Sequence, residues 1–450
     1  MNLNREILRL ALPSILANIT VPLVGMVDIA VVGHLGSADG VSGAALIGGI
    51  AIGSMLFDLL YWNFEFLRTG TGGLTAQAFG RGDGAGERHT LLRALRIALV
   101  AALGLIALQW VVVQAAFLVV DCTPEVRTLA EKYFYIRIWA APATLSLFAF
   151  KGWFIGMQDS VRPMTCDLLV NGVNILLSLG LGFGLAGLPA MGFNGVALGT
   201  VIAQWTGFLY ALIALRLHYR ALFTGPVQPV REEDVSFFSL NRDLVLRSVG
   251  LLAVYIGFTV ISARYGDVML AVSSILMKLL MVFSYFTDGF AYAGEALTGR
   301  FIGARSPEGV SSTIRGTFVW SAGVAGFFVL LYGVGGMPIF RLMTSDGAVV
   351  EAGRQFLPWL LLMPLMGTPA FVWDGIYAGA TDSRDLRNAT LLCAAGFFAA
   401  WGAGIALLPK DGCADYNALA IHVLLGAYFV HLAVRTAYLT LRRKLLMPSQ

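Results

Sequence analysis

Long apolar runs recur along the chain, separated by short segments that are charged or rich in glycine and proline. Many of these runs have about 20 residues, the length that a helix needs to cross the hydrocarbon layer of a bilayer. Their pattern predicts twelve transmembrane helices. We expect these spans near residues 7–33, 43–67, 91–118, 129–155, 163–186, 191–216, 244–264, 268–298, 314–338, 352–379, 386–408 and 416–440.

Composition supports the same fold class. Hydrophobic residues make up 57% of the 450 residues and charged residues only 13%, against about 25% charged residues in an average soluble domain. A water-soluble fold could not bury that much apolar surface. The 52 glycines fall largely inside the apolar runs, where small residues let helices approach closely. We therefore predict an all-α polytopic membrane protein that is surrounded by the lipid bilayer.

One long polar break interrupts the pattern of spans, between Leu217 and Asp243. It contains Pro226, Pro229 and the acidic residues 232–234, which are typical of a linker. The break divides the spans into six and six. We predict an N-terminal lobe over 1–216, a cytoplasmic linker over 217–243 and a C-terminal lobe over 244–450.

A short internal repeat indicates that the two lobes are related. The sequence GMQDS at 156–160 recurs as GATDS at 379–383, 223 residues later. The same shift aligns Leu74, Thr75 and Gly80 with Leu297, Thr298 and Gly303. A six-helix unit returns the chain to its starting side, so two copies are expected to be related by an axis along the membrane normal. The expected fold is two pseudo-symmetric six-helix lobes around a central cleft.

The distribution of basic residues predicts the orientation. With the N-terminus in the cytoplasm, most Lys and Arg residues fall in inner loops and at inner helix ends, as the positive-inside rule requires. Both termini are then expected to be cytoplasmic. The net charge of +4 reflects this topology, and no nucleic-acid partner is needed to explain it.

Polar residues inside spans are costly and suggest function unless they pair or reach the interface. Asp28 lies in the outer third of the first span with no basic residue nearby on its own helix, so we expect it to be functional. The fifth span carries four polar residues at helical spacing, which predicts one polar face. That face either lines a cavity or joins helices by hydrogen bonds. Its members are Asp167, Asn171, Asn174 and Ser178.

Other intramembrane charges fall in the second span and in the second half. Asp58, Tyr61, Glu65 and Arg68 share one face of the second span, where Glu65 and Arg68 are spaced for a local ion pair. The second half contains a charged set on the eighth and tenth spans. Its lysine and Lys151 are both possible partners for the acids of this set, and the sequence does not decide between them. The members are Lys278, Asp288, Glu295 and Asp374.

The sequence offers no metal or enzyme motif. Five histidines are scattered, and the four cysteines form no CxxC pair, so we expect no metal and no cofactor. The run RTGTGG at 68–73 is similar to a phosphate loop, but no strand precedes it and no GK[ST] follows. It is expected to be the glycine-rich end of the second span. The cysteines, which we expect to be packing residues, are Cys122, Cys166, Cys393 and Cys413.

Several longer strings resemble one transporter family, the multidrug and toxic compound extrusion (MATE) family, and in particular its DinF-type branch. The strings are LALPSILANITVPLVGMVDIAVVGHLG from Leu10, FLRTGTGGLTAQAFG from Phe66, LNRDLVLRS from Leu240, DGFAYAGEALTG from Asp288 and DGIYAGAT from Asp374. The resemblance covers nearly the whole chain. It implies twelve helices in two lobes and export of mostly cationic or amphipathic compounds in exchange for protons or sodium ions, without enzymatic activity.

The resemblance also assigns expected roles to residues of the first lobe. Asp28 matches the acid that carries the coupling ion, Pro13 the proline about which the first helix bends, and Asn174 an asparagine beside the acid. Ser178 stands where many relatives have a second carboxylate. The seventh span also lacks an acid, unlike the sodium-coupled branch. The resemblance therefore favours protons over Na⁺ as the coupling ion, in a bacterial-type cytoplasmic (inner) membrane and in a monomer.

The expected mechanism is alternating access. Protonated Asp28 changes its hydrogen bonding to the fifth span, the first helix bends near Pro13, and the substrate cavity shrinks. We expect the cavity to be largely aromatic and apolar, which suits small organic cations and amphipathic drugs. Candidate cavity residues are Asn171, Tyr61, Trp62, Phe150 and Trp153.

Two alternatives remain at this point. One is a flippase for lipid-linked precursors, which would need unpaired basic residues deep in the cavity. Only Arg137, Lys151 and Lys278 are candidates for such residues. The other is a membrane-embedded enzyme, which would form product without any ion gradient.

Overall fold

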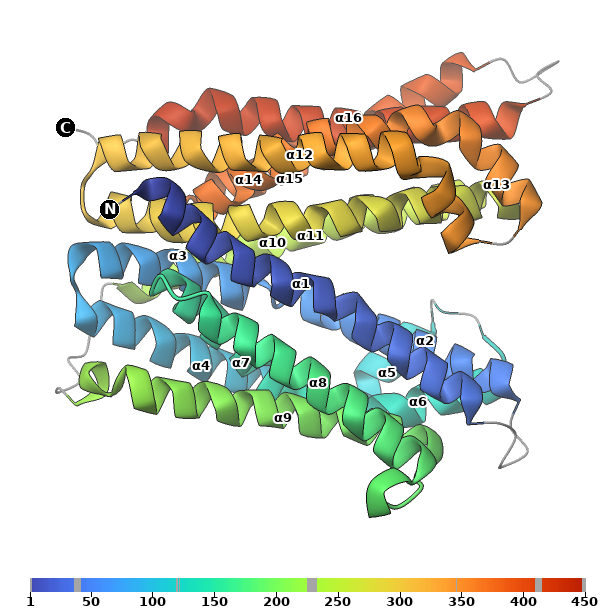
Figure 1. Ribbon diagram of the computed structural model, residues 1–450, viewed down its shortest axis with the longest axis horizontal. Coiled ribbons are helices and arrows are strands. Elements are labelled where there is room, and N and C mark those ends of the chain that lie inside the picture. Colours follow the sequence, from blue (N-terminus) through green and yellow to red (C-terminus); the bar gives the residue numbers. More distant parts are fainter. Residues whose placement is uncertain are drawn as a thin grey trace. The chain divides into compact units, whose positions relative to one another are not determined.

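The computed structural model describes residues 2–35, 42–118, 120, 122–224, 233–344, 346–408 and 415–446. Almost all of these residues are helical, and these ranges contain no strand. The chain folds into two compact units (Figure 1). The N-terminal unit comprises Leu16–Val230, and the C-terminal unit comprises Arg231–Gln450 together with Met1–Ile15. The predicted all-α membrane fold is confirmed.

The N-terminal unit is built from the second part of α1 (Leu3–His34) and eight further helices. Short 3₁₀ turns at Ile138–Ala140, Leu185–Gly187 and Arg220–Phe223 join or end some of them. The eight helices are α2 (Gly43–Trp62), α3 (Phe66–Arg81), α4 (Gly84–Ala107), α5 (Gln109–Phe117), α6 (Pro124–Arg137), α7 (Ala141–Gly156), α8 (Val161–Phe183) and α9 (Gly192–His218).

The C-terminal unit contains the start of α1 and seven further helices, with 3₁₀ turns at Arg354–Phe356 and Arg443–Leu446. The first residues of α1 and the last residues of α16 lie on the same side of this unit (Figure 1). The seven helices are α10 (Glu233–Ala263), α11 (Asp267–Gly303), α12 (Pro307–Met343), α13 (Gly347–Gly353), α14 (Leu357–Gly379), α15 (Ser383–Leu407) and α16 (Tyr416–Arg442).

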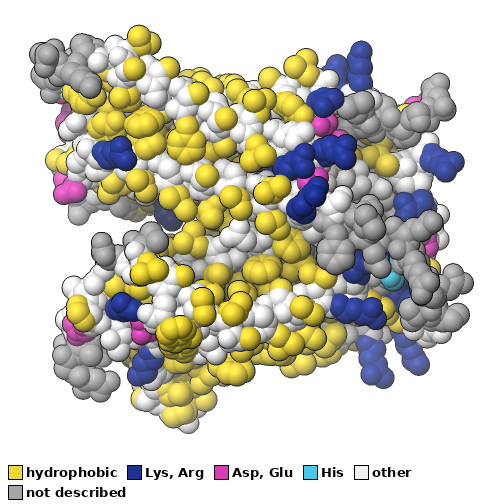
Figure 2. All heavy atoms as spheres, turned by 180° about the vertical axis from the view of Figure 1, so that it is seen from behind, with side chains coloured by type: hydrophobic (Ala, Val, Ile, Leu, Met, Phe, Trp, Pro, Cys, Tyr) yellow, Lys and Arg dark blue, Asp and Glu magenta, His cyan; other side chains and the backbone are white. Residues whose placement is uncertain are grey.

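Twelve segments of the described chain are long and apolar enough to cross a membrane, the predicted number. Three of them consist of consecutive helices, and the second runs from Gly43 to Arg81 rather than ending near residue 67. The run RTGTGG therefore lies inside α3, where its glycines are buried against neighbouring helices. Hydrophobic side chains cover the sides of both units in Figure 2, and most Lys and Arg side chains gather at one end of each unit.

Helix α1 contributes to both units, which the sequence did not predict. Its residues up to Ile15 group with the C-terminal unit and those from Leu16 with the N-terminal unit. Pro13 lies two residues before this boundary and cannot donate a backbone hydrogen bond to Arg9, which weakens the helix there. The first turn is anchored within the C-terminal unit by an ion pair between Arg300 Nη2 and Glu6 Oε2, at 2.5 Å.

The described residues at both ends of the predicted linker, 217–224 and 233–243, are largely helical. Residues 225–232, with Pro226, Pro229 and Glu232, lie outside the described residues, as does Cys413. From Glu233 onward the chain is already helical in α10. Asp243 at the predicted end of the linker is 4% exposed and accepts a hydrogen bond from Arg387 on α15, at 2.6 Å. Packing on α15 therefore makes these last residues part of the bundle.

The two units repeat the same backbone turns at the predicted shift of 223 residues. Gln158 in the first copy has φ +62° and Thr381 in the second has φ +56°, a left-handed conformation that is uncommon outside glycine. Gly82 (φ +67°) and Arg305 (φ +52°) form another matched pair. Gly82 and Arg305 each lie at the end of one helix and are followed directly by the N-cap of the next, Asp83 or Ser306. The internal repeat is thus confirmed in the backbone.

Helix packing repeats at the same shift. A Cβ atom placed on Gly152 of α7 would overlap the backbone oxygen of Arg68 on α3. A Cβ atom on Gly375 of α14 would likewise overlap the backbone oxygen of Ala291 on α11. Each glycine has a second glycine four residues later, Gly156 or Gly379, so the motif is a GxxxG contact that lets two backbones touch.

We expect Gly375→Val to destabilise the C-terminal unit by about 3 kcal/mol, since overpacking at a close backbone contact typically costs about 1–3 kcal/mol. Thermal unfolding of the purified protein in detergent measures this loss. The matched control is Gly172→Val on α8, where a new Cβ meets nothing within 4 Å. Equal melting temperatures for the two variants would contradict the close packing of α14 on α11.

Candidate functional site

Asp28 is buried inside the N-terminal unit, with 7% of its surface exposed. It lies on the part of α1 that belongs to that unit. Ser178 Oγ on α8 donates a hydrogen bond to Asp28 Oδ1, at 2.7 Å. A carboxylate removed from water in this way depends on such donors for its stability when ionised.

The contact with Asp28 continues into a chain of hydrogen bonds. Ser178 Oγ lies 3.5 Å from Asn174 Oδ1 on the same helix. The Asn174 amide donates to Thr200 Oγ1 on α9 at 2.9 Å, and Thr200 in turn donates to the carbonyl oxygen of Val196 at 3.3 Å. Asn174 and Ser178 are 2% and 0% exposed. A change at Asp28 is therefore transmitted through fixed donors and acceptors to two neighbouring helices.

The other two members of the α8 polar face also reach neighbouring helices. Asp167 forms an ion pair with Lys151 on α7. The Asn171 amide donates to Thr20 Oγ1 on α1 at 2.7 Å. All four residues of the predicted polar face therefore join α8 to other helices in this structure. Of the two alternatives, a cavity lining or a face that joins helices, this arrangement matches the second.

Arg137, at the end of α6, is a charged residue of this site that the site prediction left out. Its positive charge acts on Asp28. The Nη1 atom donates to Tyr133 Oη at 3.2 Å and to Ser54 Oγ at 3.5 Å. The guanidinium carbon also lies 4.8 Å from the ring centre of Phe57. Its basic character was visible in the sequence, but its proximity to Asp28 was not.

The four aromatic candidates divide into two pairs. Tyr61 and Trp62 are half-buried near the end of α2. Phe150 and Trp153 are 1% and 0% exposed, and Trp153 Nε1 donates to the carbonyl oxygen of Glu87 at 2.8 Å. The interpretation of Phe150 and Trp153 as cavity residues is therefore corrected. They are packing residues between α7, α4 and α9, because α7 is covered on nearly all sides.

In the second half, Asp374 pairs with neither of the two lysines that the sequence offered as partners. Asp374 on α14 pairs with Arg247 on α10, where Nη2 and Oδ2 are 2.6 Å apart, and with Arg435 on α16, where Nε and Oδ1 are 3.0 Å apart. Lys278 is exposed, and no ion pair of Lys278 is found among the described residues. Lys151 pairs within its own unit instead.

The remaining members of the second-half set lie on α11. The charge of Asp288 acts on Arg435, and Glu295 is 1% exposed. The predicted set of Lys278, Asp288, Glu295 and Asp374 is thus divided, with Arg247 and Arg435 as the basic partners. In the second span, the predicted pair of Glu65 and Arg68 is confirmed.

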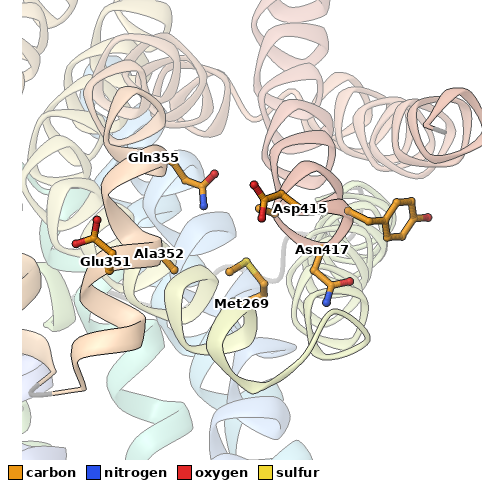
Figure 3. Close-up of a pocket in the computed structure, with 8 residues that line it drawn as sticks. Met269, Glu351, Ala352, Gln355, Asp415 and Asn417 are labelled. Atoms are coloured by element: carbon orange, nitrogen blue, oxygen red, sulfur yellow. The ribbon is translucent and has the colours of Figure 1, made fainter. Parts of the chain in front are cut away.

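A pocket of about 520 Å³ lies in the C-terminal unit. Figure 3 shows Glu351 and Gln355 on one side and Asp415 and Asn417 at the start of α16 on the other. None of the predicted site residues lines it.

Comparisons with known proteins point to one family. A family model described as MatE matches residues 13–179 and 244–399. The DNA damage-inducible protein F of Escherichia coli (strain K12) is 34% identical over 397 residues, covering 88% of this chain and 84% of that protein. The probable multidrug resistance protein NorM of Deinococcus radiodurans is 23% identical over 394 residues, covering 84% and 83%.

Solved structures agree on the fold. One is an outward-facing conformation of a multidrug resistance MATE family transporter of the MOP superfamily, with a TM-score of 0.83, 16% identity and coverage of 100% of this chain and 98% of that chain. Another is a crystal structure of MATE in the bent conformation, with a TM-score of 0.82, 17% identity and coverage of 99% and 96%.

Proposed function

The chain belongs to the MatE family, and from this membership we propose that it is a secondary active multidrug efflux antiporter. It exports cationic or amphipathic organic compounds in exchange for protons. The name of the Deinococcus radiodurans relative, a probable multidrug resistance protein, supports the substrate class. The observation that carries the proposal is the buried Asp28 with its hydrogen bond from Ser178.

The two protonation states of Asp28 require different hydrogen bonds. When ionised, Asp28 can only accept, and Ser178 supplies the proton of the bond. When protonated, Asp28 becomes a donor to Ser178, whose single hydroxyl proton then turns to Asn174 Oδ1, 3.5 Å away. One proton thereby reverses the direction of bonding along α8.

This reversal acts on α1, which carries Asp28. The first residues of α1 are held in the C-terminal unit by the pair of Glu6 and Arg300, and the later residues belong to the N-terminal unit. A weakened hold of α8 on Asp28 lets α1 bend near Pro13, where a backbone hydrogen bond is missing. Bending changes the space that is available to substrate and links proton uptake to release.

The coupling ion is a proton in this proposal. A proton needs one carboxylate oxygen, whereas hard cations take several oxygen ligands. The direct hydrogen-bond partner of Asp28 is one hydroxyl, Ser178. A proton that crosses the membrane potential contributes about 2.3 kcal/mol per 100 mV, so an ion gradient can drive export without ATP.

The protein acts as a monomer in the cytoplasmic membrane, with both termini in the cytoplasm. The gathering of Lys and Arg at one end of each unit supports this orientation (Figure 2). A flippase for polyanionic head groups would need several available basic groups together. Lys151 is paired with Asp167, so it is not available for such a head group, and the flippase alternative loses support.

Transport in vesicles tests the proposal. We expect purified protein reconstituted into liposomes to move a fluorescent organic cation when a pH gradient alone is imposed, because Asp28 loads protons. A sodium gradient alone is expected to give no transport above the vesicles without gradient. Stimulation by sodium alone would overturn the ion assignment, and no transport under either gradient would overturn the antiporter function.

A further inference from the structure

The exposed side of α9 changes from apolar to basic at the end of the helix. Leu209, Ile213 and Leu217 follow one another at intervals of four residues and are 55%, 57% and 72% exposed, so they form one ridge along the helix. Arg216 shares this side, three residues after Ile213, and is exposed. Arg220 is also exposed and begins the 3₁₀ turn that follows α9. The apolar ridge therefore ends at two arginines that are four residues apart.

These two arginines lie where the hydrocarbon layer of a bilayer ends. Helix α9 has 27 residues, so it is about 40 Å long and exceeds the roughly 30 Å of hydrocarbon. An exposed apolar ridge inside a span contacts lipid chains, and Leu217 is its last member. The long side chains of Arg216 and Arg220 place their charged ends among the lipid head groups. Figure 2 shows the same change at one end of the N-terminal unit, where Lys and Arg side chains follow the hydrophobic surface.

The turn that carries Arg220 is anchored on its inner side. The ring of Tyr219, the preceding residue, packs edge-on against Trp153 of α7, with the ring centres 4.9 Å apart. The Tyr219 hydroxyl donates a hydrogen bond to Asp159 Oδ2, at 2.9 Å. These contacts fix the backbone next to Arg220, so its exposed side chain extends from a fixed position.

The positive charge of the two arginines is not neutralised by the protein. Neither Arg216 nor Arg220 forms an ion pair with any side chain that the structure describes. Asp159, the acid that contacts this segment, is already paired with Arg162, where Nη1 and Oδ2 are 3.2 Å apart. Each guanidinium group carries five N–H donors. Two such groups at the level of the head groups are complementary to an anion there.

We propose that Arg216 and Arg220 bind the phosphate group of an anionic phospholipid, and that an acyl chain of the same lipid lies along the ridge of Leu209, Ile213 and Leu217. The planar fork of arginine matches phosphate oxygens and forms two hydrogen bonds with them at once. The ridge supplies contacts that a soluble phosphate could not use. This lipid site lies at the end of α9 and has no part in the proton exchange at Asp28.

The charge of the site favours an anionic lipid over a zwitterionic one. Both kinds of lipid carry a phosphate group and acyl chains. In a zwitterionic lipid the ammonium group cancels the phosphate charge and is repelled by the two arginines. An anionic lipid keeps its net negative charge, and the attraction is strongest at this depth, close to the surface of the membrane.

Two lipids with the same acyl chains test the proposal. We titrate the purified full-length protein in detergent with dioleoyl phosphatidylglycerol or with dioleoyl phosphatidylcholine and follow bound lipid by native mass spectrometry. The quantity compared is the ratio of the two apparent affinities, anionic over zwitterionic, for each variant. The double variant Arg216→Gln, Arg220→Gln is expected to lower this ratio roughly tenfold or more, because hydrogen bonds between charged groups are lost.

Two further variants separate a phosphate site from general attraction to anionic membranes. Arg315 on α12 is a single exposed arginine, and Val319, four residues later, is 63% exposed. Arg315→Gln thus removes one charge from another exposed face and is expected to keep the wild-type ratio. The double variant Arg216→Lys, Arg220→Lys keeps both charges without the forks and is expected to give an intermediate ratio.

An unchanged ratio in the double glutamine variant would overturn the proposal. An equal fall in Arg315→Gln would also overturn it, since any basic residue near the membrane would then have the same effect. In a third arm, inorganic phosphate is added to the wild-type protein with bound phosphatidylglycerol. Displacement of the lipid beyond that caused by chloride at the same ionic strength would assign the site to a free anion and remove the lipid as its partner.

Discussion

Asp28→Asn is expected to abolish proton-driven efflux while the protein still folds. Asparagine has nearly the same shape, and its amide oxygen can accept the hydrogen bond that Ser178 now donates to the carboxylate, at 2.7 Å. The variant therefore resembles one fixed bonding state of the site. It cannot bind or release a proton, so the reversal of bonding along α8 no longer occurs. Dye transport in liposomes under an imposed pH gradient measures the loss.

The matched control for this variant is Glu131→Gln, which also removes one carboxylate from the N-terminal unit. Glu131 pairs with Arg127 at a partly exposed position, and such pairs contribute about 0–1 kcal/mol. We expect its pH-driven transport to match the wild type. Substrate binding by Asp28→Asn is measured in parallel, so that loss of coupling is separated from loss of fold. Wild-type rates of pH-driven transport in Asp28→Asn would show that another group carries the proton.

Asp374→Asn is expected to produce the largest loss of stability in the C-terminal unit. Its carboxylate is the shared partner of Arg247 and Arg435, and the Arg435 side chain is only 5% exposed. Removing one partner of a buried ion pair costs about 3–5 kcal/mol, because the remaining charge is left uncompensated. Thermal unfolding in detergent, followed by light scattering, measures the change.

An exposed pair of the same unit gives the control for Asp374→Asn. Glu351 pairs with Arg354 at 3.1 Å, but their side chains are 74% and 56% exposed, so Glu351→Gln is expected to cost less than about 1 kcal/mol. Replacing Asp374 together with Arg435 by apolar residues is expected to cost less than the single change, since only Arg247 then lacks its partner. If Asp374→Asn unfolds at the same temperature as the wild type, the buried ion pairs do not hold α10, α14 and α16 together.

The partners of intramembrane charges show how far prediction reached. Asp28 and Ser178 were both singled out, but they are 150 residues apart, and their hydrogen bond could be expected only from the family resemblance. The sequence offered two lysines as possible partners of Asp374, and it pairs instead with two arginines from α10 and α16. Hydropathy reports how deep a residue lies along its own helix. It does not report which helix lies opposite.

The aromatic residues show the same limit. The aromatic side chains of Phe150 and Trp153 would suit a binding cavity, yet both are enclosed by protein. Arg137, which was considered only as a basic group for a flippase, instead stacks on Phe57 beside the polar face of α2. Which face of a helix is covered depends on its neighbours, and these are far away in the sequence.

The amino-acid sequence by itself determined the twelve spans, the duplicated unit and the presence of an acid at position 28 inside the membrane. These features depend on local hydropathy and on helical periodicity, which act within one helix or one repeat. The tertiary structure alone decided that the start of α1 belongs to the C-terminal unit and that Asp374 joins Arg247 and Arg435. Such pairings arise from packing between distant helices, where burial requires every charge to find whichever partner the neighbouring helix supplies.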